Sequence, residues 1–215
     1  MSTTATLIDR AALQARLYSG AGELGIALTA EQGERLLDYL ELLVRWNGVY
    51  NLTAVRDANE MVTRHLLDSL AIAHLVRGET LIDLGTGAGL PGIPLAILAP
   101  SRRVTLVDSN GKKTRFLREA VRVLGLTNVR IEQARAEDLQ GQYDCVVARA
   151  FASLVDFLRV GGHLLAADGV CVAMKGVIDE SEVAALPPGF RIEEIVPLNV
   201  PGLDAARHAV IIRPH

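Results

Sequence analysis

The first 76 residues carry apolar positions at helical spacing and none of the alternation that strands show. Leucine and valine form one stripe between residues 36 and 44, directly after a capping box that runs from Thr29 to Gln32. A second helix start is indicated at Asp57, with Glu60 three residues on. We therefore predict a helical extension over residues 1–76, packed on the rest of the chain. The first twenty or so residues carry no motif, and we expect them to tolerate variation.

The pattern changes at Thr80, where short apolar runs begin to alternate with amphipathic stretches. The runs predict buried strands, and residues 110–124 predict a helix that Gly125 ends. Such alternation indicates right-handed crossovers and a doubly wound α/β core over residues 77–215 with a mostly parallel sheet. The last two strands have no room for a crossover helix, so at least one should run antiparallel. The predicted strands are seven, at residues 81–84, 104–107, 128–133, 145–148, 170–174, 191–200 and 209–213.

Composition excludes several classes of protein. Aromatic residues make up only 4% of the chain, which argues against a stacking platform for single strands, and the net charge of −3 means that a nucleic-acid binder would need a local basic patch. Cys145 and Cys171 lie in apolar runs, which indicates buried thiols, and no closely spaced metal-ligand set is present. We find neither a signal peptide nor a run of about 18 apolar residues, so we expect a cytoplasmic protein without membrane or metal.

A glycine-rich segment follows the first predicted strand and precedes a helix, which is the context of a cofactor loop. Its glycines are Gly85, Gly87 and Gly89, with Asp83 two positions before the first, and we expect these four residues to contact a cofactor. This spacing differs from the dinucleotide fingerprint and resembles the loop of class I methyltransferases, which bind S-adenosylmethionine. Asp108 closes the next strand, where a carboxylate can accept hydrogen bonds from ribose hydroxyls. The alternative is a tight turn that binds no ligand.

Motifs elsewhere in the chain make the resemblance specific. From about residue 30 to the C-terminus the chain resembles the RsmG family, formerly called GidB. That resemblance implies a class I methyltransferase fold and methyl transfer from S-adenosylmethionine to N7 of one guanine in the 530 loop of bacterial 16S rRNA. The motifs are Trp46-Asn47, Tyr50-Asn51-Leu52-Thr53, Arg64-His65-Leu66-Leu67-Asp68-Ser69, Leu90-Pro91-Gly92, Asp108-Ser109, Lys112-Lys113, Phe116-Leu117, Arg149-Ala150-Phe151-Ala152, Lys175-Gly176 and Arg207-His208.

The resemblance also implies cofactor contacts at Gly85, Leu90, the pair Ala136-Glu137, and Arg149. For Ala136-Glu137 an ordinary helix start is the alternative. Arg149 follows the fourth strand at the carboxyl edge, so it is also a candidate for orienting the target base, and a surface arginine is the alternative.

Guanine N7 carries a lone pair and no proton, so methyl transfer to it needs no general base. We therefore expect no catalytic acid–base pair, and we reject His65 as a base. His65 and Asp68 lie three apart and could orient the target base on one helical face, or they could simply stabilise a packed helix.

One segment has the charge that RNA binding needs. Residues 102–135 contain nine basic side chains against three acidic ones. The basic stripe, by which we mean the four residues on one face of the predicted helix, can neutralise phosphates. A solvated helix face is the alternative. The stripe consists of Lys112, Arg115, Arg118 and Arg122.

Three other functions stay open. A methyltransferase for another RNA would share both the loop and the basic stripe, whereas one for a small molecule or a protein would share the loop but has no use for the stripe. A nicotinamide-dependent oxidoreductase conflicts with the glycine spacing, and a non-enzymatic RNA-binding module has no need of the loop, Asp108 or Arg149. We expect a monomer whose partner is the 16S rRNA of the small ribosomal subunit.

Overall fold

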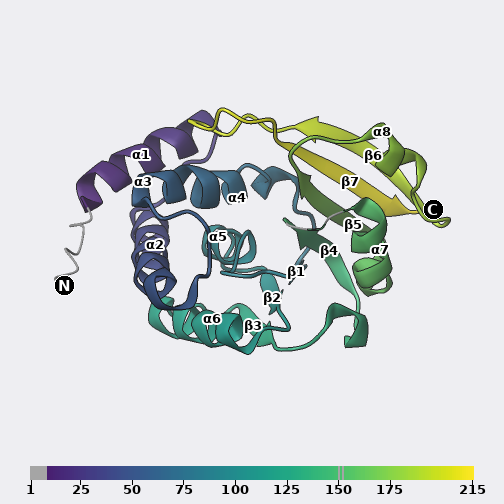
Figure 1. The fold of residues 1–215 in the computed structure, drawn as a ribbon, viewed down its shortest axis with the longest axis horizontal. Coiled ribbons are helices and arrows are strands. Elements are labelled where there is room, and N and C mark those ends of the chain that lie inside the picture. The colour runs from purple at the N-terminus through teal and green to yellow at the C-terminus, as the bar shows by residue number, and fades with distance from the viewer. Residues whose placement is uncertain (1–8, 150, 152) are drawn as a thin grey trace.

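A computed structural model gives the fold of the chain and describes residues 9–149, 151 and 153–215 (Figure 1). Its centre is a seven-stranded sheet with the order β3-β2-β1-β4-β5-β7-β6. The first five strands are parallel, and β7 runs antiparallel to both β5 and β6, as predicted. The strands are β1 (Thr80–Leu84), β2 (Arg103–Val107), β3 (Val129–Glu132), β4 (Tyr143–Ala148), β5 (Leu165–Lys175), β6 (Phe190–Pro197) and β7 (His208–Pro214).

Helices cover the sheet and fill the N-terminal region. The helix predicted over residues 110–124 is α6, and the left-handed Gly125 ends it as expected. The helices between β4 and β6 were not predicted. The α-helices are α1 (Arg10–Glu23), α2 (Ala30–Tyr50), α3 (Ala58–Met61), α4 (Asp68–Leu70), α5 (Gly92–Leu98), α6 (Gly111–Leu124), α7 (Leu154–Gly161) and α8 (Glu180–Ala184). The π-helical segment is η1 (Val62–Leu67), and the 3-10 turns are η2 (Ala73–Leu75), η3 (Ala136–Asp138) and η4 (Gly162–Leu164).

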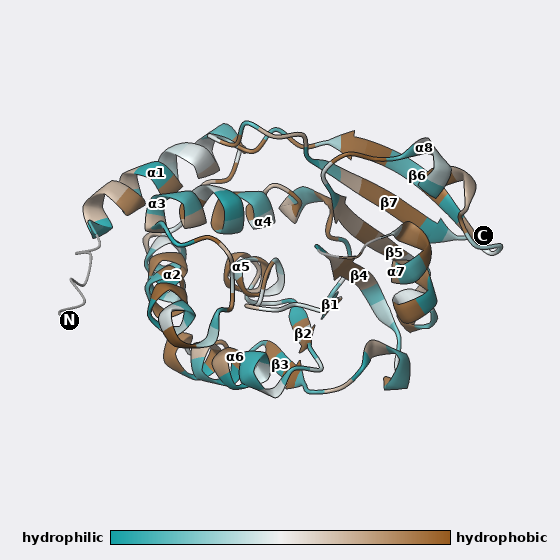
Figure 2. Ribbon diagram, viewed as in Figure 1, coloured by the Kyte–Doolittle hydropathy of each residue, from teal (hydrophilic) through white to brown (hydrophobic). Residues whose placement is uncertain are grey.

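The sheet is buried on both faces because alternate side chains of each strand enter different apolar clusters. Leu81 packs with α2, α5 and α6, whereas its neighbour Ile82 packs with α7 on the opposite face. Figure 2 shows the consequence for sequence, since β5 and β7 are almost wholly apolar while α6 alternates between apolar and polar positions. Continuous apolar runs therefore marked these two central strands correctly.

The first helix is part of this core. Leu13 and Leu17 of α1 are buried in the same cluster as Leu81 of the sheet. Arg10 forms ion pairs with three carboxylates of α2, at 2.6 to 2.8 Å. The expectation that this segment tolerates variation is wrong for residues 10–23, because an amphipathic helix without a sequence motif can still bury its apolar side chains. The division into an extension and a core stays our proposal.

Two predicted helix starts are confirmed. Thr29 and Gln32 form the capping box of α2, and the Asp57 side chain accepts a hydrogen bond from the backbone of Glu60. The helix that begins after Asp57 changes into the π-helical segment η1 and continues as α4. A π turn closes hydrogen bonds five residues apart, and the Asp68 backbone N–H accordingly donates to the carbonyl of Thr63 as well as to that of His65.

Other expectations concern what the fold lacks. Across residues 9–149, 151 and 153–215 no helix is long and apolar enough to span a bilayer. The same residues contain no group of three or more side chains that could hold a metal ion. Cys145 and Cys171 are buried with free thiols, as predicted.

Candidate active site

The glycine-rich loop follows β1 at the carboxyl edge of the sheet. The strand order reverses between β1 and β4. In doubly wound sheets, ligands bind at the carboxyl ends of the strands beside such a reversal, which is called the switch point. Gly85, Gly87 and Gly89 have φ of 64°, 62° and 92°, conformations that other residues rarely adopt. At Gly89 an added Cβ would also collide with Ile93. The loop therefore needs glycine for its backbone path.

Asp83 supports the loop from behind. Its side chain is fully buried, and Oδ2 accepts hydrogen bonds from Thr86 Oγ1 at 2.5 Å and from the Gly92 backbone at 2.8 Å. Oδ1 has no hydrogen-bond partner among the described residues. Burial raises the pKa of this carboxyl group to about 7. Asp83 was predicted as a cofactor contact, and the structure places it beneath the loop, away from the cavities described below.

Asp108 joins the loop to the start of α6. It follows β2 and is 6% exposed. Its carboxylate accepts hydrogen bonds from the backbone of Gly87 at 3.0 Å and of Asn110 at 2.9 Å, and Lys113 Nζ lies 3.4 Å away. Two carboxylates thus hold the loop, one below it and one beside it.

Three cavities lie in a row along this edge. The first, of about 410 Å³, is lined by residues after β1, β2 and β3 and by Phe151. We call it the Asp108 cavity. The pair predicted from the resemblance, Ala136 and Glu137, lines it together with Gly85 and Asp108.

The second cavity, of about 190 Å³, lies at the glycine loop, and we call it the loop cavity. Gly85 and Lys113 line both it and the Asp108 cavity, so the two adjoin. The predicted residues Gly87, Leu90 and Arg149 also line it. Gly89 does not, and its role is in the turn itself.

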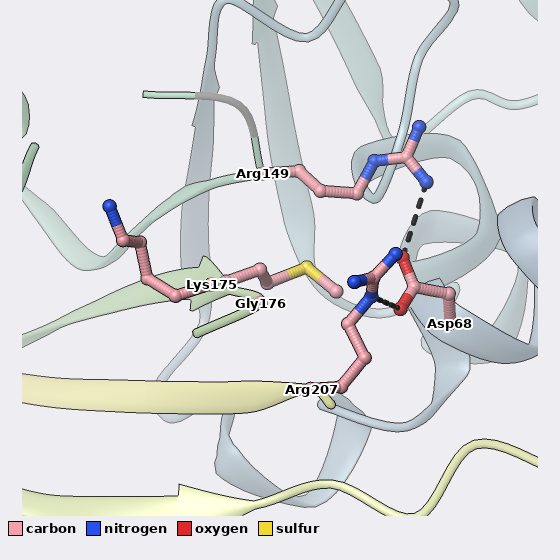
Figure 3. Close-up of a pocket in the computed structure, with 6 residues that line it drawn as sticks. Asp68, Arg149, Lys175, Gly176 and Arg207 are labelled. Carbon is pink, nitrogen blue, oxygen red and sulfur yellow. Dashed lines mark hydrogen bonds and ion pairs between the residues drawn. The ribbon is translucent and has the colours of Figure 1, made fainter. Parts of the chain in front are cut away.

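The third cavity, of about 210 Å³, is lined by Asp68, Arg149, Met174, Lys175, Gly176 and Arg207. We call it the Asp68 cavity. Figure 3 shows the Asp68 carboxylate between two guanidinium groups, with Arg149 Nη1 at 3.3 Å from one oxygen and Arg207 Nε at 3.0 Å from the other. Arg149 lines both the loop cavity and the Asp68 cavity, so it stands at their junction.

His65 does not join Asp68 in this arrangement. Its Nε2 lies 2.9 Å from Thr53 Oγ1, and its ring lines none of the three cavities. Burial and the positive charge of Arg149 lower the pKa of the His65 ring to about 4. His65 and Asp68 thus contact different partners, Thr53 and the two arginines, and a joint role in orienting the target base stays a prediction.

The comparisons with known proteins agree with this geometry. The family model described as rRNA small subunit methyltransferase G, GidB, matches residues 32–211. The chain belongs to this family. Two relatives carry the name ribosomal RNA small subunit methyltransferase G. The one from Stenotrophomonas maltophilia is 56% identical over 94% of this chain and 95% of its own, and the one from Xanthomonas campestris pv. campestris is 58% identical over 86% and 89%.

Solved structures add the fold. The mitomycin 7-O-methyltransferase MmcR has a TM-score of 0.60 at 19% identity, over 97% of this chain and 74% of its own. TrmN from Thermus thermophilus has a TM-score of 0.56 at 22% identity, over 72% of this chain and 53% of its own. This rRNA methyltransferase G family member therefore has the α/β fold of class I methyltransferases, as predicted.

The basic stripe of this family member lies on the outer face of α6. All four of its side chains are exposed, which agrees with the predicted helix face. Arg122 pairs with Glu119 at 2.8 Å, whereas the other three form no ion pair within the described part of the chain. Three unpaired cations on one helix remain available to a polyanion.

Sequence reasoning gave no role to several residues that line the cavities. Lys175 and Arg207 belong to motifs that the family resemblance uses, and their place near the carboxyl end of β5 and just before β7 was readable from the strand predictions. Thr53 and Lys113 were also parts of motifs, and both line the loop cavity. The sequence could not show the direction in which each of these side chains points.

Proposed function

We propose that this chain transfers a methyl group from S-adenosylmethionine to N7 of one guanine in the 530 loop of 16S rRNA. The observation that carries the proposal is the row of three adjoining cavities at the switch point of the sheet, in a chain that belongs to the rRNA small subunit methyltransferase G family. A cofactor would occupy the first two cavities and leave the third for a base.

The residues of the Asp108 cavity suit a nucleoside. Asp108, which follows β2 directly, lines it, and its carboxylate oxygens can accept hydrogen bonds from ribose hydroxyls. Ala136, Val107 and Phe151 supply apolar contact for an adenine ring, and Glu137 supplies an acceptor for its amino group. A carboxylate, an apolar slot and a glycine turn in this order fit the adenosine end of S-adenosylmethionine.

The loop cavity suits the amino-acid end of the same cofactor. Its floor is the backbone of Gly85 and Gly87, and its wall includes the cationic side chains of Lys113 and Arg149. Of the Arg149 nitrogens, only Nη1 is hydrogen-bonded in the described structure, to Asp68 and to the Arg64 carbonyl. Donors therefore remain for a carboxylate. When bound, S-adenosylmethionine supplies a methyl group on a positively charged sulfur.

The proposed reaction needs no acid–base catalysis by the protein. Guanine N7 has an in-plane lone pair and no proton, so no base would be needed to remove one. Its bond to the methyl carbon would form as the carbon–sulfur bond breaks, with the electron pair left on sulfur. The buried His65, with its lowered pKa and its contact to Thr53, is in keeping with a reaction that uses no general base. The protein's contribution would be alignment of the two reactants, worth up to about 7–11 kcal/mol in favourable cases.

The basic stripe on α6 is our candidate for rRNA contact. Helix α6 begins directly after Asp108 and Asn110, so its first turn lies at the mouth of the Asp108 cavity. Exposed arginines suit phosphate groups because the guanidinium fork binds two oxygens at once. RNA held by the first turn of this helix would lie beside the carboxyl edge of the sheet, and the later arginines would contact phosphates farther from it.

The test is methyl transfer from labelled S-adenosylmethionine to small ribosomal subunits from a strain that lacks the gene, followed by mapping of the label. We expect label on N7 of a single guanine, loss of it in Asp108→Asn, and normal label in the control Asp156→Asn, a half-buried aspartate that lines none of the three cavities. Label on another atom or another RNA would overturn the substrate assignment. Failure of the chain to bind the cofactor would overturn the whole proposal.

A further inference from the structure

The Asp68 cavity lies beyond the two cavities that suit the cofactor. Arg149 is shared with the loop cavity, so the two spaces meet at its guanidinium group. The other walls come from β5, the residue after it, and the segment before β7. A ligand in this cavity would therefore lie next to the amino-acid end of the cofactor, where the methyl group is transferred.

Asp68 gives this cavity its chemical character. Its side chain is 3% exposed, yet the residue lines the cavity. Each carboxylate oxygen accepts one hydrogen bond, from Arg149 and Arg207 respectively. A carboxylate has about four acceptor positions, so one hydrogen bond to each oxygen leaves acceptor capacity for a ligand. Figure 3 shows both guanidinium groups directed at this one side chain.

The polar edge of guanine matches this arrangement. Guanine presents two neighbouring donors, N1–H and the 2-amino group, next to one acceptor, O6. We propose that the Asp68 cavity holds the target guanine, with Asp68 accepting from N1–H and the 2-amino group and Arg149 donating to O6. In this arrangement N7, which lies on the other side of O6, faces the loop cavity. Adenine is disfavoured because its N1 is an acceptor and would meet the carboxylate.

A phosphate group of the RNA is the main competing occupant, since two arginines line the cavity. The charges argue for the base. Lys175 is already paired with Glu182 at 2.9 Å, and Asp68 lies between the two arginines. An anion would have to approach this carboxylate closely, whereas a neutral base with two donors is attracted to it.

The inference rests on the proposed function, and the experiment separates the two. Small ribosomal subunits are reconstituted with 16S rRNA that carries either guanosine or inosine at the methylated position, and kcat/KM for N7 methylation is measured with each. Inosine differs only by lacking the 2-amino group. For the unaltered protein we expect inosine to be about 10- to 100-fold poorer, the usual effect of losing a hydrogen bond to a charged group.

Two variants then assign the discrimination to its residue. In Asp68→Ala we expect the guanosine-to-inosine ratio to fall to within about threefold of unity, whatever the remaining rate, since the acceptor is gone. Arg207→Gln is the matched control, because it breaks the same ion-pair cluster but keeps the carboxylate. We expect it to retain the ratio of the unaltered protein even where its rate falls.

Three results would overturn the inference. The first is equal methylation of guanosine and inosine by the unaltered protein, a measurement that stands even if Asp68→Ala does not fold. The second is a ratio that survives in Asp68→Ala. The third is loss of the ratio in Arg207→Gln as well, which would show that the cluster acts only through structure. Absence of any N7 label on guanosine subunits would instead overturn the proposed function.

Discussion

Asp83 is the residue whose ionisation should be visible in the stability of the protein. It is fully buried beneath the glycine loop, and burial raises its pKa from an ordinary value of 3.8 to about 7. The native state therefore binds this proton more tightly than the unfolded chain does. Because stability falls with pH wherever the native state holds the extra proton, Asp83 should destabilise the fold progressively as pH rises from 4 to 7.

The magnitude follows from the two pKa values. Each pH unit in this window is worth about 1.4 kcal/mol, so the interval from pH 4.5 to pH 7 costs about 3 kcal/mol, and little changes above it. Asp83→Asn removes the titration. The amide oxygen can still accept from Thr86 and Gly92, as Oδ2 does in the native loop. Relative to the unaltered protein, the variant should therefore gain about 3 kcal/mol between pH 4.5 and pH 8.

The assay is urea unfolding of both proteins at several pH values between 4.5 and 8, with the difference in unfolding free energy plotted against pH. Other groups titrate in both proteins and cancel in the difference. Asp144→Asn is a control for which the pH dependence should have the opposite sign. Hydrogen bonds from Thr80 and Glu79 lower the pKa of Asp144, so its contribution to the free energy of unfolding is lost as pH falls. A flat difference for Asp83→Asn would refute the reasoning.

Three further predictions concern the loop, the stripe and the first helix. Gly85→Val should abolish cofactor binding by calorimetry and cost about 1–3 kcal/mol in stability, because φ at this position is 64°, and near-normal affinity would contradict the loop assignment. Replacing Arg115, Arg118 and Arg122 with glutamate should weaken rRNA binding and reduce its logarithmic salt slope by about 2, and unchanged salt dependence would show that RNA does not use this face. Leu17→Ala should cost about 2–5 kcal/mol in urea unfolding, since the side chain is fully buried, and a cost below 1 kcal/mol would mean that α1 detaches readily.

The parts of the fold that depend on local pattern were predictable. The buried parallel strands β1, β2, β4 and β5 contain short apolar runs, and all seven predicted segments overlap strands of the sheet, although β3 and β6 have no buried residue. Gly125 marked the end of α6, and the antiparallel end of the sheet followed from the short connection alone. In each case a local rule and the final fold agree, so no tertiary contact was needed to decide.

The burial of α1 and the side-chain positions around Asp68 could not be predicted from the sequence, for opposite reasons. Helix α1 carries only a weak apolar stripe, and its burial depends on α2 and on the π-helical segment that it meets. The segment around His65 carries a strong helical pattern, but a π turn shifts the side chains that follow it. Sequence spacing cannot show such a shift, because the same types of residue form π turns and α turns.

The candidate site also has one part that could be predicted from the sequence and one part that could not. The loop glycines and Asp108 follow strand ends directly, so topology alone brings them together at the carboxyl edge. The Asp68 cluster instead joins a helix before the sheet to Arg207, 139 residues later, and no spacing rule connects them. Arg149 belongs to both sets, since it follows β4 at the switch point and reaches Asp68. The half of the site that suits the cofactor is thus set by the fold, which distant class I methyltransferases share, while the half that would select the base depends on side-chain pairs that only the folded chain reveals.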